Sequence, residues 1–377
     1  MLSFIDDPQA VNADWLTAVL QQGGHLNSGK VRDLRKTALG GSVGFLSRVV
    51  RLTCEYEGSC STLPNSFILK AHTVIPNFLE LAEELKAFDR ELGFYQRFHQ
   101  KVKSRLPHFY GGYSDGGRGW LLIEDLCSAE PCDQVVGLSN SQVVKTLENI
   151  AAVHALCWQS KELELIDWLP SNDFWFSCKS GLEDSWNTLK QSYALRIGPE
   201  ACQLFDKFTK HYKELFEQLK SKPKTLIHGD LRADNLMLSR EANTTDEVII
   251  LDWQTATQSL GAIDVAFLIA GSEPAAERHG HVHSLVCAWH SKLLDNGITD
   301  YSFEEAYEDV RFALLLCLAV PIKAFEELGG PNFKNAREAQ LAELMIFRYS
   351  QAALDLNISD LLDARKVCHT SSPETKK

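Results

Sequence analysis

The most constraining feature of the sequence is a pair of short apolar runs, each followed by a fixed set of polar residues. The first run ends at Ile227 and is followed by His228-Gly229-Asp230-Leu231-Arg232-Ala233-Asp234-Asn235. The second run ends at Leu251 and is followed by Asp252-Trp253-Gln254, so that Asp252 comes 17 residues after Asn235. Short apolar runs between polar turns are typical of buried strands. The pattern predicts a strand–loop–strand unit with Asp230 and Asn235 on one loop and Asp252 at the end of the next hairpin.

These polar groups suit a phosphoryl-transfer site. A carboxylate such as that of Asp230 can accept the proton of an acceptor hydroxyl. Oxygen atoms of Asn235 and Asp252 can hold Mg²⁺ against nucleotide phosphates, and rigid hairpins suit a cation that demands octahedral geometry. The alternative is a solvated acidic hairpin, in which the Asp and Asn side chains only stabilise turns.

The two motifs, H-G-D-x-x-x-x-N and I-x-D-W-Q, resemble those of the aminoglycoside phosphotransferase and choline kinase-like family. The two motifs are most similar to those of the family's ecdysteroid kinase-like branch, also called CHK kinase-like. The resemblance implies an α+β, two-lobed protein-kinase-like fold, with a small β-rich N-terminal lobe and a larger, mostly helical C-terminal lobe. It also implies ATP and Mg²⁺ as cofactors, Asp230 as the catalytic residue, and Asn235 and Asp252 as metal ligands, while His228 fixes the loop.

The resemblance extends, with lower specificity, to a glycine turn near the N-terminus. Gly41, Ser42 and Gly44 lie between two expected strands, where the family has the loop that covers the nucleotide. Glycines let the backbone approach phosphates closely, and backbone N–H groups can bind them. An ordinary hairpin turn is the alternative.

Lys70 ends a short apolar strand, as the phosphate-pairing lysine of kinase-like lobes does. An edge-strand lysine is the alternative. Such a lysine needs a glutamate from the next helix, and the apolar periodicity leaves Glu84 and Glu91 as candidates. The resemblance selects Glu91, because Phe88-Asp89-Arg90-Glu91-Leu92-Gly93-Phe94-Tyr95 is similar to the branch's F-x-x-E-x-x-(F)Y pattern. Lys70 and Glu91 are therefore expected, with the glycine turn, to bind the nucleotide.

The character of the chain changes near residue 126. Residues 1–125 contain several strand-like segments and are predicted to form the nucleotide-binding lobe. Residues 126–377 are predicted to form the catalytic and acceptor-binding lobe. From Ala262 onward the pattern is again helical. Further helices are expected over Ala13–Gln22, Leu79–Val102, Val143–Trp158, Trp186–Arg196 and Cys202–Leu219.

Composition excludes several classes of protein. The net charge of −12 argues against a general nucleic-acid-binding protein, because an acidic chain repels phosphate backbones. The longest apolar run, Phe312–Ile322, is too short to span a bilayer. The first residues lack the basic and apolar regions of a signal peptide, and none of the 10 cysteines has C-x-x-C spacing. We therefore expect a cytoplasmic protein with reduced thiols.

The acceptor is expected to be the hydroxyl group of a small molecule, because neither an A-P-E segment nor a long activation segment follows Asp252. A hydrophobic, steroid-like alcohol fits the branch, whereas an amino-sugar or choline-like cation fits the acidic charge. The aromatic residues over Trp158–Phe176 either line the acceptor pocket or belong to the core. A catalytically silent nucleotide- or ligand-binding protein and a protein kinase are the alternatives. The sequence leaves the acceptor's identity and the oligomeric state open.

Overall fold

The structure, a computed structural model, describes residues 4–39, 46–58, 63–172, 181–239 and 247–363. The chain forms two compact units. The first unit consists of Met1–Glu130, Ile166–Leu169 and Met237–Ala256, and the second of Pro131–Leu165, Pro170–Leu236 and Thr257–Lys377. Residues 237–256, predicted as part of the C-terminal lobe, thus pack with the N-terminal residues. The division into a nucleotide-binding and an acceptor-binding lobe stays a prediction.

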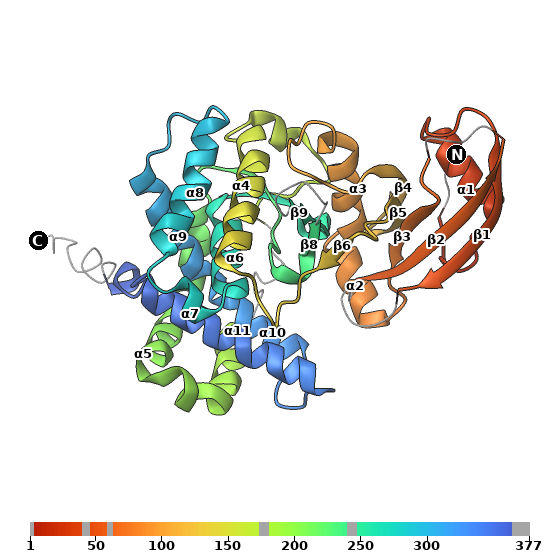
Figure 1. Ribbon diagram of the computed structural model, residues 1–377. Helices are drawn as coiled ribbons and strands as arrows, with labels where there is room; N and C mark the ends of the chain where they lie inside the picture. The colour runs from red at the N-terminus through yellow and green to blue at the C-terminus, as the bar shows by residue number, and fades with distance from the viewer. Residues whose placement is uncertain (1–3, 40–45, 59–62, 173–180, 240–246, 364–377) are drawn as a thin grey trace, which may run out of the picture. The chain divides into compact units, whose positions relative to one another are not determined.

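The first unit is built on a five-stranded antiparallel sheet with the order β1-β2-β3-β5-β4 (Figure 1). Its strands are β1 (Lys30–Ala38), β2 (Ser47–Glu57), β3 (Ser66–His72), β4 (Phe109–Asp115) and β5 (Arg118–Glu124). The sheet confirms the β-rich character that the sequence predicted for this part of the chain. A second sheet has the order β6-β8-β9, with β6 (Ala129–Pro131), β8 (Leu236–Ser239) and β9 (Glu247–Ile250).

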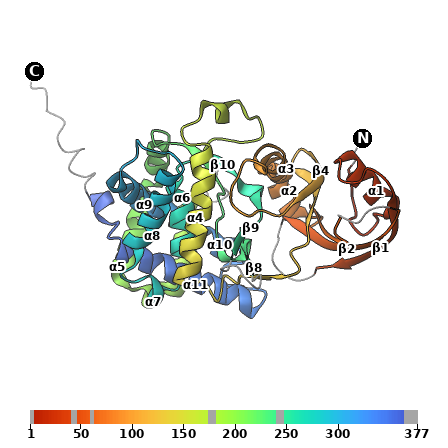
Figure 2. The same ribbon diagram turned by 45° about the horizontal axis from the view of Figure 1, so that its top comes forward.

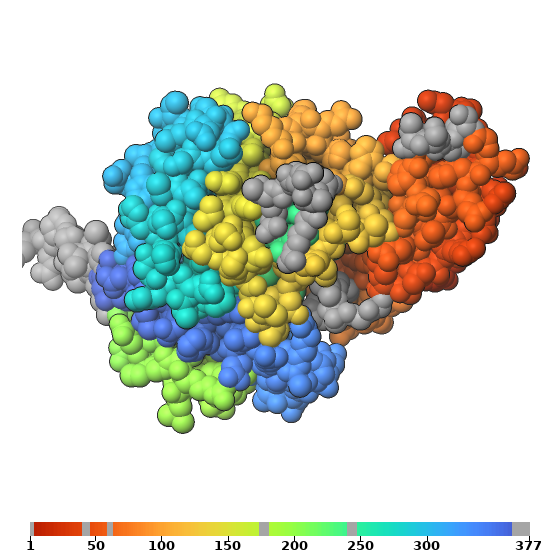
Figure 3. All heavy atoms as spheres, viewed as in Figure 1, coloured from red at the N-terminus to blue at the C-terminus, as the bar shows by residue number. Residues whose placement is uncertain are grey.

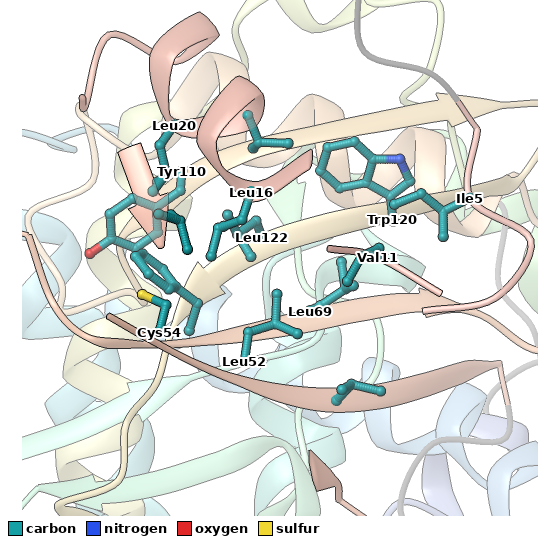
Figure 4. Packing of buried hydrophobic residues seen from close by; sticks show 14 of the residues in the cluster. Ile5, Val11, Leu16, Leu20, Leu52, Cys54, Leu69, Tyr110, Trp120 and Leu122 are labelled. Atoms are coloured by element: carbon teal, nitrogen blue, oxygen red, sulfur yellow. The ribbon is translucent and has the colours of Figure 1, made fainter. Parts of the chain in front are cut away.

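One face of the large sheet is covered by α1 (Ala13–Gln22), the helix that the sequence predicted with these bounds. The Asn12 side chain caps it by accepting the N–H of Trp15. Leu16 and Leu20 of α1 lie between the helix and the strands, where Leu122 belongs to the same buried cluster (Figure 4). Each such side chain contributes about 1.5–3 kcal/mol when it is fully buried, so this cluster holds α1 against the sheet.

The predicted single helix over Leu79–Val102 is wrong: the segment forms α2 (Pro76–Glu84) and α3 (Ala87–Phe98). The break lies at Lys86, which has a left-handed backbone with φ 51°. The turn between β4 and β5 sets this break, because the Gly117 N–H donates to the Asp89 carboxylate at 2.6 Å. A Cβ at Gly117 would also lie 2.5 Å from the carbonyl oxygen of Ala82, so only glycine fits there. Tertiary contacts therefore override the continuous helical periodicity.

Trp168 approaches α3 closely, although it lies some seventy positions further along the chain. A Cβ at Gly93 would lie 2.2 Å from a ring carbon of Trp168. The Trp168 ring also packs edge-on against Phe98, with ring centroids 6.2 Å apart. Because Trp168 belongs to the first unit, this contact ties the segment Ile166–Leu169 to the helix that carries Glu91.

The second unit is mostly helical, as predicted (Figure 2). Its helices are α4 (Asn140–Leu156), α5 (Leu182–Leu219), α6 (Ala262–Ser272), α7 (Ala275–Arg278), α8 (Val282–Asp295), α9 (Phe303–Cys317), α10 (Ala319–Glu327) and α11 (Ala336–Asp355). A small antiparallel pair, β7 (Thr225–Ile227) and β10 (Thr257–Ser259), lies among them. Short 3₁₀ turns cover Lys161–Leu165 and Ala233–Asn235, and Trp253–Thr255 in the first unit.

The long helix α5 is interrupted, as the prediction of two helices over Trp186–Arg196 and Cys202–Leu219 required. The break lies at Gly198, whose φ of 84° and ψ of 167° are not helical, and Pro199 follows it. Glycine adopts this conformation without strain, and proline at the next position restarts a helix easily. α5 packs against α10 and α11, and the three form one continuous surface (Figure 3).

Among the described helices, none combines the length and the apolar character that crossing a bilayer requires.

The contact between Trp168 and α3 predicts the effect of one substitution. Gly93→Ala should lower the melting temperature of the protein, because its methyl group would overlap the indole ring. Overpacking costs about 1–3 kcal/mol, which exceeds the gain of about 1 kcal/mol from replacing glycine in a helix.

The control is the same substitution in a Trp168→Ala background, where the obstacle is absent and Gly93→Ala should be neutral or stabilising. A Gly93→Ala protein as stable as the native one, measured by thermal unfolding, would show that the ring does not constrain α3.

Candidate functional site

The loop after β7 carries the H-G-D motif and is held by a buried carboxylate. Asp264 lies in the first turn of α6 and is fully buried. Its Oδ2 accepts the backbone N–H of His228 at 2.7 Å, and its Oδ1 accepts that of Gly229 at 2.9 Å. Gly229 has φ 82°, a left-handed conformation that favours glycine. Asp264 therefore anchors the loop.

A histidine from α4 completes the surroundings of Asp264. His154 is buried, and its Nε2 lies 3.2 Å from the Asp264 Oδ2. Its Nδ1 accepts the indole N–H of Trp289 at 3.0 Å, so Nε2 carries the ring proton and donates it to Asp264. The carboxylate thus accepts hydrogen bonds from three groups in two segments of the chain, and the start of α6 adds a favourable dipole.

Asp230 lies at the start of a short polar turn, in which its carboxylate has several neighbours. The Nδ2 of Asn235 donates to the carbonyl oxygen of Asp230 at 2.8 Å and to its Oδ2 at 3.1 Å. The Nε of Arg232 donates to the same Oδ2 at 3.2 Å. The Asp230 N–H donates to the Nδ1 of His228 at 3.2 Å, which fits a structural role for this histidine. The structure therefore brings Asp230 and Asn235 together in the second unit.

Sequence reasoning missed Gln134, which supports this turn from about 100 residues upstream. Gln134 is buried, and its backbone N–H donates to the Asp234 Oδ1 at 2.8 Å. Its side-chain oxygen accepts the N–H of Ala233 at 2.9 Å. The guanidinium of Arg348 in α11 holds the Gln134 carbonyl oxygen at 2.6 Å. No motif marks Gln134, because its partners come from distant parts of the chain.

The first unit brings together Lys70, Glu91 and Asp252. The Lys70 Nζ lies 2.7 Å from Glu91 and 2.9 Å from Asp252. Burial alone would lower the pKa of Lys70, but the two carboxylates outweigh burial and raise it. Burial raises the pKa of Glu91 to about 7, although the Lys70 ammonium opposes this shift. The Glu91 carboxylate also accepts a backbone hydrogen bond from Trp253. One ammonium group is thus shared between two carboxylates.

The residues after Asp252 fix it to α3. The Trp253 indole is fully buried and stacks on Phe94, with ring centroids 3.6 Å apart and an interplanar angle of 8°. Asp252 itself has φ 64°, a left-handed conformation that is uncommon outside glycine and is frequent at functional sites. The Ser47 hydroxyl of β2 donates to the Oε1 of Gln254 at 3.3 Å. The D-W-Q motif therefore joins the Lys70 strand, α3 and the Asp252 turn.

Other predicted positions lie elsewhere. Gly41, Ser42 and Gly44 lie outside the described residues, as does the aromatic stretch 174–176. Trp158 packs on Tyr301, with centroids 4.8 Å apart, so its ring belongs to the packing of the second unit. A cavity of about 780 Å³ in the same unit is lined by residues that include Lys222, Tyr301 and Asp309, but not by Asp230 or Asn235.

The donor set fits Mg²⁺ and nucleotide phosphates. Because the Nδ2 of Asn235 donates to Asp230, the Oδ1 is the atom of this side chain that could bind a cation. Asp252 supplies a second hard oxygen donor, which is the type that Mg²⁺ prefers. Around Lys70, the carboxylates of Glu91 and Asp252 share a single ammonium group. An added cation would offset this excess of negative charge.

The loop anchor predicts a loss of stability in Asp264→Asn. The amide that replaces one carboxylate oxygen would face a hydrogen-bond donor in either orientation, because both oxygens accept N–H groups. An unsatisfied buried polar group costs about 1–3 kcal/mol, which denaturant unfolding can measure.

The matched control is Asp363→Asn, which breaks an exposed pair with Lys207. Exposed pairs contribute at most about 1 kcal/mol, so this variant should unfold almost like the native protein. Equal stability of the two variants would contradict the anchoring role of Asp264.

Comparison with known proteins identifies the family. A profile of the ecdysteroid kinase-like family matches residues 42–298, which is more than half of the chain. No curated protein sequence matches the chain. A protein from Ralstonia eutropha JMP134, provisionally named an aminoglycoside phosphotransferase, has a similar structure with a TM-score of 0.53. The two chains are 17% identical, and the match covers 92% of this chain and 97% of that chain.

The microcompartment-associated aminopropanol kinase is similar with a TM-score of 0.51 and 16% identity, over 89% of this chain and 95% of that chain. Because the sequence identities are low, these structural similarities establish the fold alone. It is the α+β kinase-like fold predicted from the sequence. The resemblance inferred from the two motifs is confirmed by the family profile. The chain belongs to the ecdysteroid kinase-like family.

Proposed function

We propose that the protein is an ATP-dependent kinase that transfers the γ-phosphoryl group of Mg-ATP to the hydroxyl group of a small molecule. The observation that carries this proposal is the position of Lys70 between Glu91 and Asp252, at 2.7 and 2.9 Å. A buried lysine oriented by a helix glutamate is the phosphate-binding device of kinase-like lobes. Family membership and the intact motifs support the same function.

In the proposed site, Lys70 binds the α- and β-phosphates, and Glu91 keeps its ammonium in place. Nucleotide binding would draw the ammonium from Asp252 toward the phosphates, which frees the Asp252 carboxylate for Mg²⁺. Asn235 would supply a second oxygen ligand. When bound, Mg²⁺ would neutralise part of the negative charge of the phosphate groups. The glycine turn that includes Gly41, Ser42 and Gly44 remains the proposed cover of the nucleotide.

Asp230 is the proposed catalytic residue. Its carboxylate would accept a hydrogen bond from the acceptor hydroxyl and take the proton as the bond to phosphorus forms. Arg232 places a positive charge 3.2 Å from this carboxylate. Most of the rate enhancement would come from positioning and charge neutralisation, since a loose transition state requires little covalent work.

The acceptor belongs to one of two classes. A hydrophobic, steroid-like alcohol agrees with the name of the family, whereas an amino-sugar or amino-alcohol agrees with the acidic character of the chain. Both classes belong in the first substrate panel. If neither is phosphorylated and Mg-ATP still binds, the protein would be a catalytically silent nucleotide-binding member of the family.

The nucleotide site predicts a magnesium-dependent stabilisation by ATP. A ligand that binds only the folded protein raises its stability by about 2.7 kcal/mol at 100 times its dissociation constant. We expect Mg-ATP to raise the melting temperature of the native protein, and Asp252→Ala to remove this shift.

The matched control is Asp363→Ala, an aspartate in an exposed ion pair, which should keep the shift. The absence of any shift at millimolar Mg-ATP in the native protein would contradict the proposed function.

If Asp230 is the catalytic residue, its replacement should reduce turnover of the acceptor but not the binding of Mg-ATP. Asp230→Ala should keep the thermal shift with Mg-ATP, because Asp252 and Lys70 remain. It should lower phosphorylation of the acceptor by at least about 10²-fold, the usual contribution of a general base. Radiolabelled ATP and the acceptor panel would measure this, and near-native turnover in Asp230→Ala would exclude the proposed mechanism.

A further inference from the structure

Arg232 lies beside the proposed catalytic carboxylate, and nothing in the family motif assigns a role to it. Its Nε donates to the Asp230 Oδ2 and its Nη1 to the Asp234 Oδ2, each at 3.2 Å. The side chains of Arg232 and Asp230 are each 19% exposed. The ion pair is therefore neither sealed in the core nor fully solvated, and a substrate at Asp230 can reach the guanidinium.

The turn does not depend on Arg232 for its shape. The backbone N–H of Gln134 already holds the Asp234 Oδ1 at 2.8 Å, and the Gln134 side chain holds the Ala233 N–H at 2.9 Å. The Asn235 amide ties the other end of the turn to the Asp230 carbonyl oxygen at 2.8 Å. Arg232 is therefore one of several groups that hold this turn, and its guanidinium can serve a further role there.

We propose that Arg232 is a catalytic residue that binds the oxygens of the phosphoryl group during transfer. This inference rests on the proposed kinase function. A hydroxyl oxygen held by Asp230 is the atom to which the phosphorus becomes bonded, so the phosphoryl group must pass within reach of a guanidinium 3.2 Å from that carboxylate. A planar guanidinium matches the geometry of phosphate oxygens and keeps its charge at every physiological pH.

The transfer step balances without any further reactant. The acceptor oxygen forms a bond to the γ-phosphorus while the bond between that phosphorus and the β,γ-bridging oxygen breaks. The electron pair of the broken bond stays on the β-phosphate of the departing ADP, and the hydroxyl proton moves to Asp230. Negative charge is spread over the three equatorial oxygens during this passage, and Arg232 would stabilise it. An arginine supplied in this way is worth about 10³–10⁵-fold in kcat.

The alternative is a purely structural role, in which Arg232 only holds Asp234. Arg337 provides the matched control, because its guanidinium contacts Asp234 at 3.8 Å and Asp133 at 2.9 Å. If holding Asp234 were the only role of Arg232, then Arg232→Gln and Arg337→Gln should behave alike. Arg232→Lys keeps the charge and tests how far the planar guanidinium is needed.

The test uses a mimic of the transferred phosphoryl group and needs no acceptor. Isothermal titration would measure the affinity of the full chain for MgADP, with and without aluminium fluoride, in the native protein and the three variants. We expect aluminium fluoride to tighten MgADP binding to the native protein. Arg232→Gln should lose at least about tenfold of this tightening, Arg232→Lys should lose less, and Arg337→Gln should keep it. All should bind MgADP alone with similar affinity and melt at similar temperatures.

Two results with aluminium fluoride would overturn the inference and leave the kinase function intact. In the first, the native protein binds MgADP, but aluminium fluoride does not increase its affinity. In the second, aluminium fluoride increases the affinity for MgADP equally in the native protein and in Arg232→Gln. Equal losses in Arg232→Gln and Arg337→Gln would also overturn it, in favour of the structural role. Native protein that binds no MgADP would instead overturn the proposed function, and the inference with it.

Discussion

The buried carboxylate of Asp264 is the interaction on which the geometry of the catalytic loop depends. It accepts hydrogen bonds from the backbone of His228 and Gly229 and from the ring of His154. An ionised group in a dry interior is costly unless its oxygens are satisfied, so the arrangement of these donors is strongly determined. The direction in which the chain leaves β7, and with it the position of Asp230, follows from this requirement.

Each unit contains a group of charged residues, and the two groups share one electrostatic pattern. In the first unit one ammonium, that of Lys70, is shared between Glu91 and Asp252; in the second one guanidinium, that of Arg232, is shared between Asp230 and Asp234. Each cation contacts both of its carboxylates and holds them in place. Neither has enough positive charge to neutralise both, and this is the condition under which a divalent cation binds favourably.

Local patterns predicted the elements whose partners are near in sequence. The helix Ala13–Gln22 follows from its apolar periodicity and its capping residue. The strands of the large sheet follow from the pattern of their apolar residues. The break at Lys86 could not be predicted, because the contact with Gly117 that sets it comes from a hairpin about thirty residues away. The roles of Gln134 and Arg348 could not be predicted for the same reason. Their hydrogen bonds join distant segments, and neither residue belongs to a motif.

The sequence by itself determined the family, the fold class and the identity of Lys70, Glu91, Asp230, Asn235 and Asp252 as candidates, since these depend on residue types at short spacings. Only the tertiary structure decided which of them meet. It showed Lys70 pairing with both Glu91 and Asp252, and Arg232 lying against Asp230. The physical reason is that spacing along a chain constrains neighbours within a turn or a helix, whereas burial of charge selects partners that are far apart in the chain.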